Sequence, residues 1–152
     1  MVKSSIIVAW LYGLLFVPLC LAQQPDGATA FYNKGVQYLD AGDPFNALEA
    51  FTEAIARKPG FADAYCGKGD AYSRTSRYPL AIEAYSRAIK LQPGHSNALC
   101  GRGFAYCYSE QYEPARKDFA AAIGADVGKA ELIVGFLVDQ VEIFNSSLKE
   151  NK

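Results

Sequence analysis

The sequence has no marked excess of charge of either sign, and it contains only one histidine. Its 152 residues carry 15 lysines and arginines against 16 aspartates and glutamates, which leaves a formal net charge of −1. Because no basic run and no acidic tail occurs, nucleic acid and anionic membrane surfaces are poor candidates as partners. The length suits one ordinary domain and is too short for two comfortable ones.

Motifs of catalysis and metal binding are equally scarce. His95 has no aspartate or cysteine next to it in the sequence, so we expect a solvated loop histidine rather than a general base. The segment GKGDAYS, residues 67–73, has the letters of a phosphate-binding loop in the wrong arrangement and inside a predicted helix. No CxxC pair suggests a metal site. The sequence therefore predicts a protein that is not an enzyme, with no catalytic residues, metal, cofactor or evident small-molecule substrate.

The first 22 residues differ in composition from the rest of the chain. Lys3 is followed by an apolar run that ends at Ala22, with Cys20 as a second small residue, before two polar glutamines. A basic start, an apolar stretch and small residues at its end are the parts of a secretory signal peptide. We expect cleavage between Ala22 and Gln23, and hence a secreted or periplasmic protein. The alternative is an uncleaved membrane anchor over residues 6–22, because about 17 apolar residues are at the short limit for a bilayer span.

Matched residue types recur at intervals of 34 residues. The columns are Phe31, Tyr65 and Leu99; Gly35, Gly69 and Gly103; Tyr38, Tyr72 and Tyr106; Ala47, Ala81 and Ala115; Phe51, Tyr85 and Phe119; and Ala54, Ala88 and Ala122. Self-similarity at one such period indicates a repeat architecture. Within each unit, steps of four and three place the first three columns on one helix and the last three on a second.

The glycines inside the first helices require an explanation, because each lowers the stability of its helix by about 1 kcal/mol relative to alanine. Large residues on one helix can fill the gaps left by small residues on the other, so that the two antiparallel helices approach closely. We therefore expect Gly69 and Gly103 to lie against Tyr85 and Phe119, respectively. Expected helices span residues 28–41, 44–57, 62–75, 78–91, 96–109 and 112–124.

Helix punctuation agrees with this assignment. Asp43 is a suitable N-cap, and Pro44 follows at the first helical position, where its missing N–H costs nothing. One ion pair is also predicted, between Arg102 on a first helix and Asp118 on the second helix of the same unit. The lysines that precede Gly35 and Gly69 should make looser contacts or none.

A final helix is expected at about 129–149. It has a broad apolar stripe but lacks the glycine and alanine columns, and a solenoid needs an atypical terminal helix to close its open apolar end. We interpret the helix as that cap. The alternative is a helix that binds a partner or associates with itself.

These columns closely resemble the tetratricopeptide repeat. Three repeats at approximately 28–61, 62–95 and 96–129 follow the signal peptide (1–22) and a short linker (23–27), and a capping helix and tail (129–152) come after them. The resemblance implies an all-α fold, a right-handed superhelix of antiparallel helix pairs whose first helices line a concave groove. Members of the family bind peptides or protein segments and are rarely enzymes.

The resemblance also implies which residues would contact a partner in the groove. They are Tyr32, Asn33, Val36, Leu39, Asp70, Ser73, Arg74, Asn97, Phe104 and Tyr108. One subgroup of the family holds a C-terminal carboxylate with lysine, arginine and asparagine, and only Asn33 fits that pattern here. The expected face is mostly apolar and aromatic, which suits an apolar segment or an amphipathic helix.

The cysteines left after cleavage are expected to be reduced. Cys66 and Cys100 occupy the same column of neighbouring repeats and should be about 9–10 Å apart, beyond the limit of roughly 7 Å for a disulfide. Cys100 and Cys107 are seven residues apart on one helix, also about 10 Å.

Three functions are compatible with the sequence. The leading one is an exported interaction module that binds a protein or peptide in its groove, with a membrane involved only if the N-terminal segment is uncleaved. The second is a structural subunit of an envelope or membrane-attached complex, which would use its convex side or its C-terminal helix. A thiol redox protein is a minor third. Asn145 begins a glycosylation sequon, which matters only in a eukaryotic secretory pathway.

Overall fold

The computed structural model describes the backbone of residues 26–150 and the side chains as far as residue 141. The predicted signal peptide, its cleavage site at Ala22 and Gln23, and Asn145 as a side chain lie outside this description. The described backbone forms α2 (Gly27–Asp40), α3 (Pro44–Arg57), α4 (Ala62–Arg74), α5 (Tyr78–Leu91), α6 (Ser96–Tyr108), α7 (Tyr112–Ala125) and α8 (Lys129–Glu150). Every helix begins and ends within one residue of the predicted bounds.

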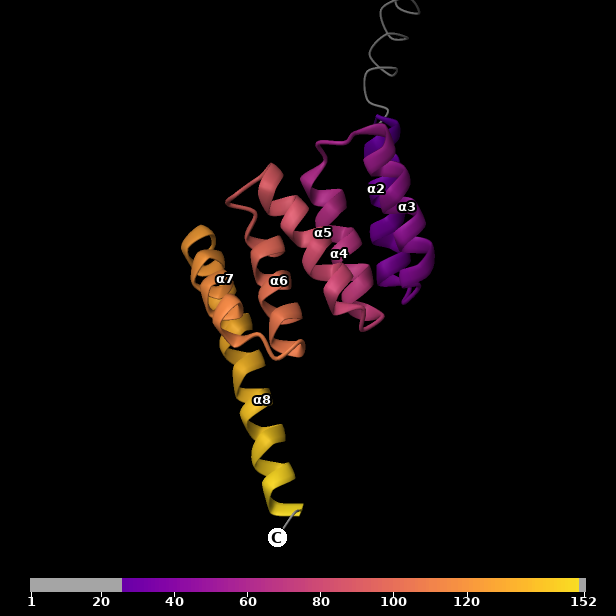
Figure 1. Ribbon diagram of the computed structural model, residues 1–152. Coiled ribbons are helices and arrows are strands. Elements are labelled where there is room, and N and C mark those ends of the chain that lie inside the picture. Colours follow the sequence, from indigo (N-terminus) through magenta and orange to yellow (C-terminus); the bar gives the residue numbers. More distant parts are fainter. Residues whose placement is uncertain (1–25, 151–152) are drawn as a thin grey trace, which may run out of the picture.

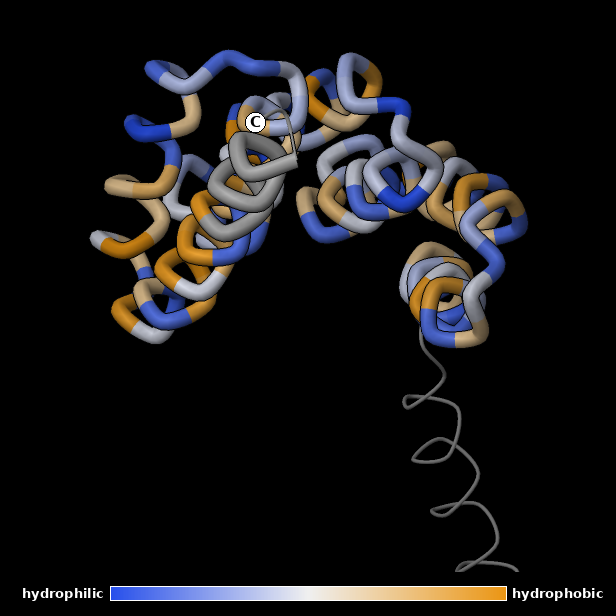
Figure 2. Tube along the Cα trace, turned by 90° about the horizontal axis from the view of Figure 1, so that it is seen from below, coloured by the Kyte–Doolittle hydropathy of each residue, from blue (hydrophilic) through white to orange (hydrophobic). Residues whose placement is uncertain are grey.

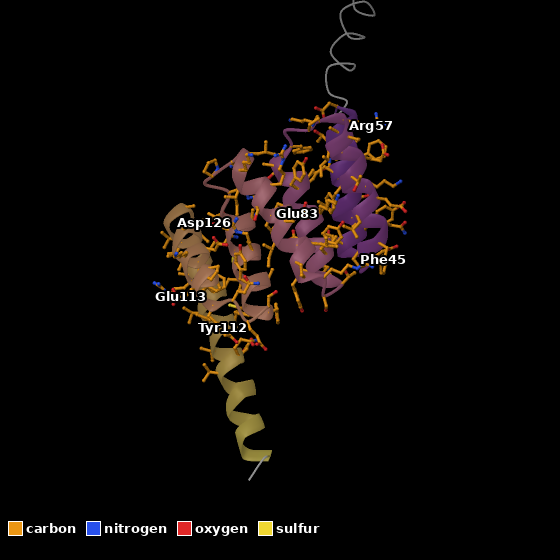
Figure 3. All side chains as sticks on the ribbon, in the orientation of Figure 1. Phe45, Arg57, Glu83, Tyr112, Glu113 and Asp126 are labelled. Atoms are coloured by element: carbon orange, nitrogen blue, oxygen red, sulfur yellow. The ribbon has the colours of Figure 1, made fainter. Side chains whose placement is uncertain are left out.

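The helices are arranged as a row of neighbouring pairs. Helices α2 and α3, α4 and α5, and α6 and α7 pack as three pairs, and each second helix also contacts the first helix of the next pair. Figure 1 shows this row from α2 to α7, and Figure 2 shows from below that the row follows an arc. Phe45 on α3 and Glu113 on α7 mark its two outer edges in Figure 3. The predicted all-α solenoid is confirmed.

Equivalent turns join the two helices of each pair. One residue in each turn has a left-handed backbone conformation: Gly42 (φ 77°), Ser76 (φ 56°) and Glu110 (φ 59°). The next amide donates to the carbonyl oxygen of the repeated tyrosine, at 2.8, 2.9 and 2.8 Å in the three turns. This bond satisfies a carbonyl that the helix end leaves without a partner. The predicted N-cap also forms, since the Asp43 carboxylate accepts the Asn46 amide at 3.1 Å.

The repeated glycines lie directly against the repeated aromatic rings. A Cβ added to Gly69 would be 2.6 Å from the ring of Tyr85, and one added to Gly103 would be 2.5 Å from the ring of Phe119. Real Cβ atoms do not approach other atoms so closely, so no larger residue fits without a shift. The prediction that the glycines allow close approach within each pair is confirmed.

A second set of glycines, not predicted from the sequence, joins one pair to the next. A Cβ on Gly67 of α4 would be 2.5 Å from Phe51 of α3, and one on Gly101 of α6 would be 2.6 Å from Tyr85 of α5. Phe51 therefore lies between Gly35 and Gly67, and Tyr85 has the same arrangement one repeat later. Each ring fills a gap within its own pair and also joins that pair to its successor.

The predicted ion pair between α6 and α7 is formed. Arg102 donates from Nε and Nη2 to the two carboxylate oxygens of Asp118, at 2.6 and 2.7 Å, and from Nη1 to the Ser86 hydroxyl at 2.9 Å. Asp118 is buried, so this planar double contact supplies partners that water does not. Lys34 and Lys68, the equivalent residues, form no ion pair within the described residues and lie near tyrosine rings of their own helices.

Within the described residues, helix α8 covers the end of the solenoid with its first two turns. Ile133 is buried in a cluster with residues of α6 and α7, and the ring centroid of Phe136 lies 4.6 Å from that of Phe104. Gly135 continues the spacing of Gly67 and Gly101, yet a Cβ there would meet nothing within 4 Å. The helix then extends past the other helices (Figure 1). Among its described side chains, the exposed apolar ones are Leu132, Val134, Leu137, Val138 and Val141.

Candidate functional site

The first helices of the three pairs, together with α8, line a groove of about 600 Å³. Nine of the ten residues predicted for the groove line it: Tyr32, Val36, Leu39, Asp70, Ser73, Arg74, Asn97, Phe104 and Tyr108. The tenth, Asn33, is exposed on α2 and is not among the lining residues. That these residues bind a partner stays a prediction.

One wall of the groove is aromatic and is built by α6 and α8. The ring of Phe136 packs on Phe104 at 4.6 Å and meets Tyr108 edge-on at 5.6 Å. Tyr108 also stacks on Tyr78 at 5.0 Å, and it is 52% exposed. The resemblance did not point to Phe136, because it lies on the helix that departs from the repeat pattern. This wall offers an apolar surface that water reaches.

The opposite wall comes from α2. Tyr32 packs against Phe61 and Phe51, with ring centroids 5.1 and 5.8 Å away, and Val36 and Leu39 continue the same side of the helix. Burial raises the pKa of Tyr32, and the carboxylates of α4 raise it further. The phenol of Tyr32 is therefore neutral and lies near negative charge.

Asp70 of α4 lies on the groove floor between these walls. It accepts a hydrogen bond of 2.7 Å from the hydroxyl of Tyr85, whose oxygen also lies 3.4 Å from the Ser73 hydroxyl. Burial raises the pKa of Asp70, while the Tyr85 hydroxyl and Arg74 act in the opposite direction. Burial also raises the pKa of Tyr85, so this hydroxyl acts as a neutral donor. The buried position of Asp70 therefore disfavours the ionised form of its carboxylate.

His95 is not the solvated loop residue that we expected. It is 7% exposed, its Nδ1 accepts the Ala98 amide at 3.3 Å, and its Nε2 lies 3.1 Å from the carboxylate of Asp63. Because Nδ1 accepts the Ala98 amide, Nε2 is the ring nitrogen that donates to Asp63. The histidine thus caps α6 and fixes its start to α4. No sequence pattern indicates this contact, because Asp63 lies 32 residues before His95.

The two cations that line the groove have other partners. Arg74 donates from Nη1 to the carbonyl oxygen of Leu39 at 2.9 Å, and the Lys129 amine lies 4.0 Å from the carboxylate of Asp126. The arginine therefore holds α4 to the end of α2. This arrangement does not make the pair of free cations that a carboxylate clamp needs.

The cysteines offer little support for thiol chemistry. Cys66 and Cys100 are buried at the groove floor, Cys107 is half-buried, and all three are free thiols. Burial raises the pKa of each thiol, and thiolate is the reactive form. The described residues also contain no cluster of three or more side chains suited to a metal ion.

Comparison with known proteins agrees with this geometry. Residues 32–96 match the family model described as Tetratricopeptide repeat. The first TPR domain of human RPAP3 is similar at 22% identity, over 85% of this chain and 99% of that chain, with a TM-score of 0.71. The second TPR of Spaghetti (RPAP3), bound to the HSP90 peptide SRMEEVD, is similar at 24% identity, over 66% and 94% of the two chains, with a TM-score of 0.65.

A third similar structure is MamA, at 32% identity and a TM-score of 0.60. The match covers 68% of this chain but only 57% of the MamA chain. Among curated proteins, none matches the sequence significantly.

Proposed function

We propose that this chain, which belongs to the tetratricopeptide repeat family, is an exported interaction module that binds a peptide or helix of a partner protein in its groove. The observation that carries the proposal is the groove itself, which runs across α2, α4 and α6 with solvent-accessible aromatic side chains on its walls. Concave sites with apolar walls and a few polar groups are the usual ligand sites of proteins. The HSP90 peptide bound to the second TPR of Spaghetti supports a peptide as the class of ligand.

Replacing Tyr108 with alanine tests this function with little disturbance of the core. The exposed ring forms part of the groove wall, whereas Phe104 also packs on Phe119 inside the solenoid, with ring centroids 5.2 Å apart. We expect the Tyr108→Ala protein to recover roughly 5–30 times less partner from extracts of its host, because a wall aromatic residue commonly contributes 1–2 kcal/mol or more to binding. Quantitative capture followed by mass spectrometry measures the ratio.

Tyr112→Ala is the matched control. Tyr112 is 66% exposed at the start of α7 and does not line the groove, so the same truncation there should leave recovery unchanged. Equal recovery by the Tyr108→Ala and wild-type proteins would contradict binding in the groove.

Export is the second part of the proposal and rests on the composition of residues 1–22. We expect protein isolated from its host to begin at Gln23, because a small residue precedes it and polarity changes there. N-terminal sequencing measures this directly, and an intact Met1 would instead favour the membrane anchor. Within the described residues, no helix is long and apolar enough to cross a bilayer.

One observation favours the second candidate, a structural subunit that assembles through α8. This helix carries several exposed apolar side chains, which is unusual for a surface that contacts only water. Figure 2 shows hydrophobic residues recurring along it. The capture experiment separates the two functions. A subunit of this kind would keep its partner in Tyr108→Ala and lose it in Val138→Ser, whereas a groove-binding module would show the reverse.

A further inference from the structure

We propose that the groove selects a peptide segment in which a lysine or arginine side chain is flanked by apolar residues, and that Asp70, assisted by Asp63, pairs with that cation. The inference rests on the proposed function, because it assigns a ligand chemistry to the same groove. It concerns specificity, and it can therefore fail while peptide binding itself holds.

The first argument is that, among the described residues, neither carboxylate has a lysine or arginine as its ion-pair partner. Asp70 accepts from the Tyr85 hydroxyl, and Asp63 accepts from Nε2 of His95. Within the same part of the chain, only one oxygen of Asp70 accepts a hydrogen bond. Their negative charge is thus available to a ligand.

Two lining cations offset part of this charge: Arg74, which lowers the pKa of Asp70 against the effect of burial, and Lys129. Arg74 is held by the carbonyl oxygen of Leu39, and the Lys129 amine lies near Asp126, which is outside the groove. Asp40 adds a third carboxylate to the lining. The three lining carboxylates therefore outnumber Arg74 and Lys129, and an acidic peptide would meet an excess of negative charge.

The second argument is that the repeat does not require an acid at this position. Residues 34 positions before and after Asp70 are Val36 and Phe104, both apolar and both in the groove. Burial raises the pKa of Asp70, which means that the folded chain is less stable with this carboxylate ionised. Asp70 thus carries a charge that lowers the stability of the fold, and it lies in the centre of the groove. This combination is typical of a residue that serves binding.

The third argument concerns shape. Asp63 and Asp70 are two helical turns apart on α4, about 10.5 Å along its axis, and therefore on the same face. The apolar stem of a lysine or arginine can lie along Tyr32 and Val36 while its charged end reaches Asp70. Apolar neighbours of that residue would then rest on the aromatic wall formed by Phe104, Tyr108 and Phe136.

The test uses purified full-length protein and a library of random heptapeptides with blocked termini. We expect the selected peptides to carry lysine or arginine at one position between apolar residues. The affinity of the best peptide, measured by fluorescence anisotropy, should fall at least tenfold when glutamine replaces that cationic residue. SRMEEVD should bind no better than a scrambled peptide.

Variants of the protein then locate the contact. In Asp70→Asn the glutamine and lysine peptides should bind with similar affinity, and the thermal midpoint should be unchanged or higher, because the buried charge is gone and the Tyr85 hydroxyl keeps an acceptor. Asp139→Asn, on the exposed part of α8, should behave as wild type in both respects. A merely structural Asp70 would instead lower the midpoint and leave the preference for lysine intact.

Two results would overturn the inference and are distinguishable. Selected peptides that are neutral or acidic, and whose binding is lost in Tyr108→Ala, would leave groove binding standing but reject the cation. Selection of no peptide at all would reject the proposed function together with the inference. The lysine-to-glutamine comparison on wild-type protein decides the matter even if Asp70→Asn fails to fold.

Discussion

Replacing Tyr85 with alanine is expected to lower the free energy of unfolding by about 3–5 kcal/mol, the range for removing a large aromatic side chain from a core. The ring is 2% exposed and lies between Gly69 of its own pair and Gly101 of the next. The backbones on both sides are held by their own helices, so the cavity has little opportunity to collapse. Urea unfolding followed by circular dichroism measures the loss as a lower midpoint.

Two further substitutions show which part of Tyr85 matters. Tyr85→Phe keeps the ring and removes only the hydrogen bond to Asp70, so we expect a loss of about 1 kcal/mol. Tyr112→Ala removes the same number of atoms from an exposed site and should change stability by less than about 0.5 kcal/mol. A Tyr85→Ala protein as stable as Tyr112→Ala would contradict the packing described here.

The fold was predictable because its determinants lie close together in the sequence or recur at one period. Helix bounds follow from steps of three and four residues and from caps such as Asp43. The contact between Gly69 and Tyr85, and the pair of Arg102 with Asp118, follow from the same spacing, because both join two helices separated by one short turn.

Contacts between successive repeats were harder to predict. Gly67 and Gly101 have a packing role that only the stacking of one pair on the next defines. The bond from His95 to Asp63 likewise depends on how α6 starts beside α4. The turn residues Ser76 and Glu110 adopt the same left-handed conformation as Gly42 in the first repeat. Glycine favours this conformation, whereas serine and glutamate do not, so it could not be predicted from their residue types.

The position of the groove could be predicted from the sequence, but the hydrogen bonds and ion pairs of its side chains could not. The resemblance supplied nine of its lining residues, because first-helix positions recur with the repeat. It did not supply Phe136 or Lys129, since α8 departs from the pattern. It also could not show that Arg74 donates to a backbone carbonyl, or that Asp70 forms no ion pair with a lysine or arginine of the described residues, because both facts depend on three-dimensional contacts.

Gly101 and Gly135 offer the sharpest test of how α8 is placed. They are 34 residues apart and are both helical, but only Gly101 faces an aromatic ring: its added Cβ would lie 2.6 Å from Tyr85, whereas Gly135 has nothing within 4 Å. Leucine is a far better helix former than glycine, so any site with free space should gain up to about 1 kcal/mol from the exchange.

We therefore expect opposite signs from the same substitution. Gly101→Leu should lower the free energy of unfolding by about 3 kcal/mol, at the upper end for overpacking, because the Tyr85 ring is itself held against Gly69 and has no room to move. Gly135→Leu should raise it by about 0.5–1 kcal/mol. Urea unfolding of both variants at low protein concentration, where α8 cannot associate, gives the two values. A loss at Gly135 as large as that at Gly101 would mean that α8 packs against Phe119 as a regular fourth repeat would, and that the open placement of this helix is wrong.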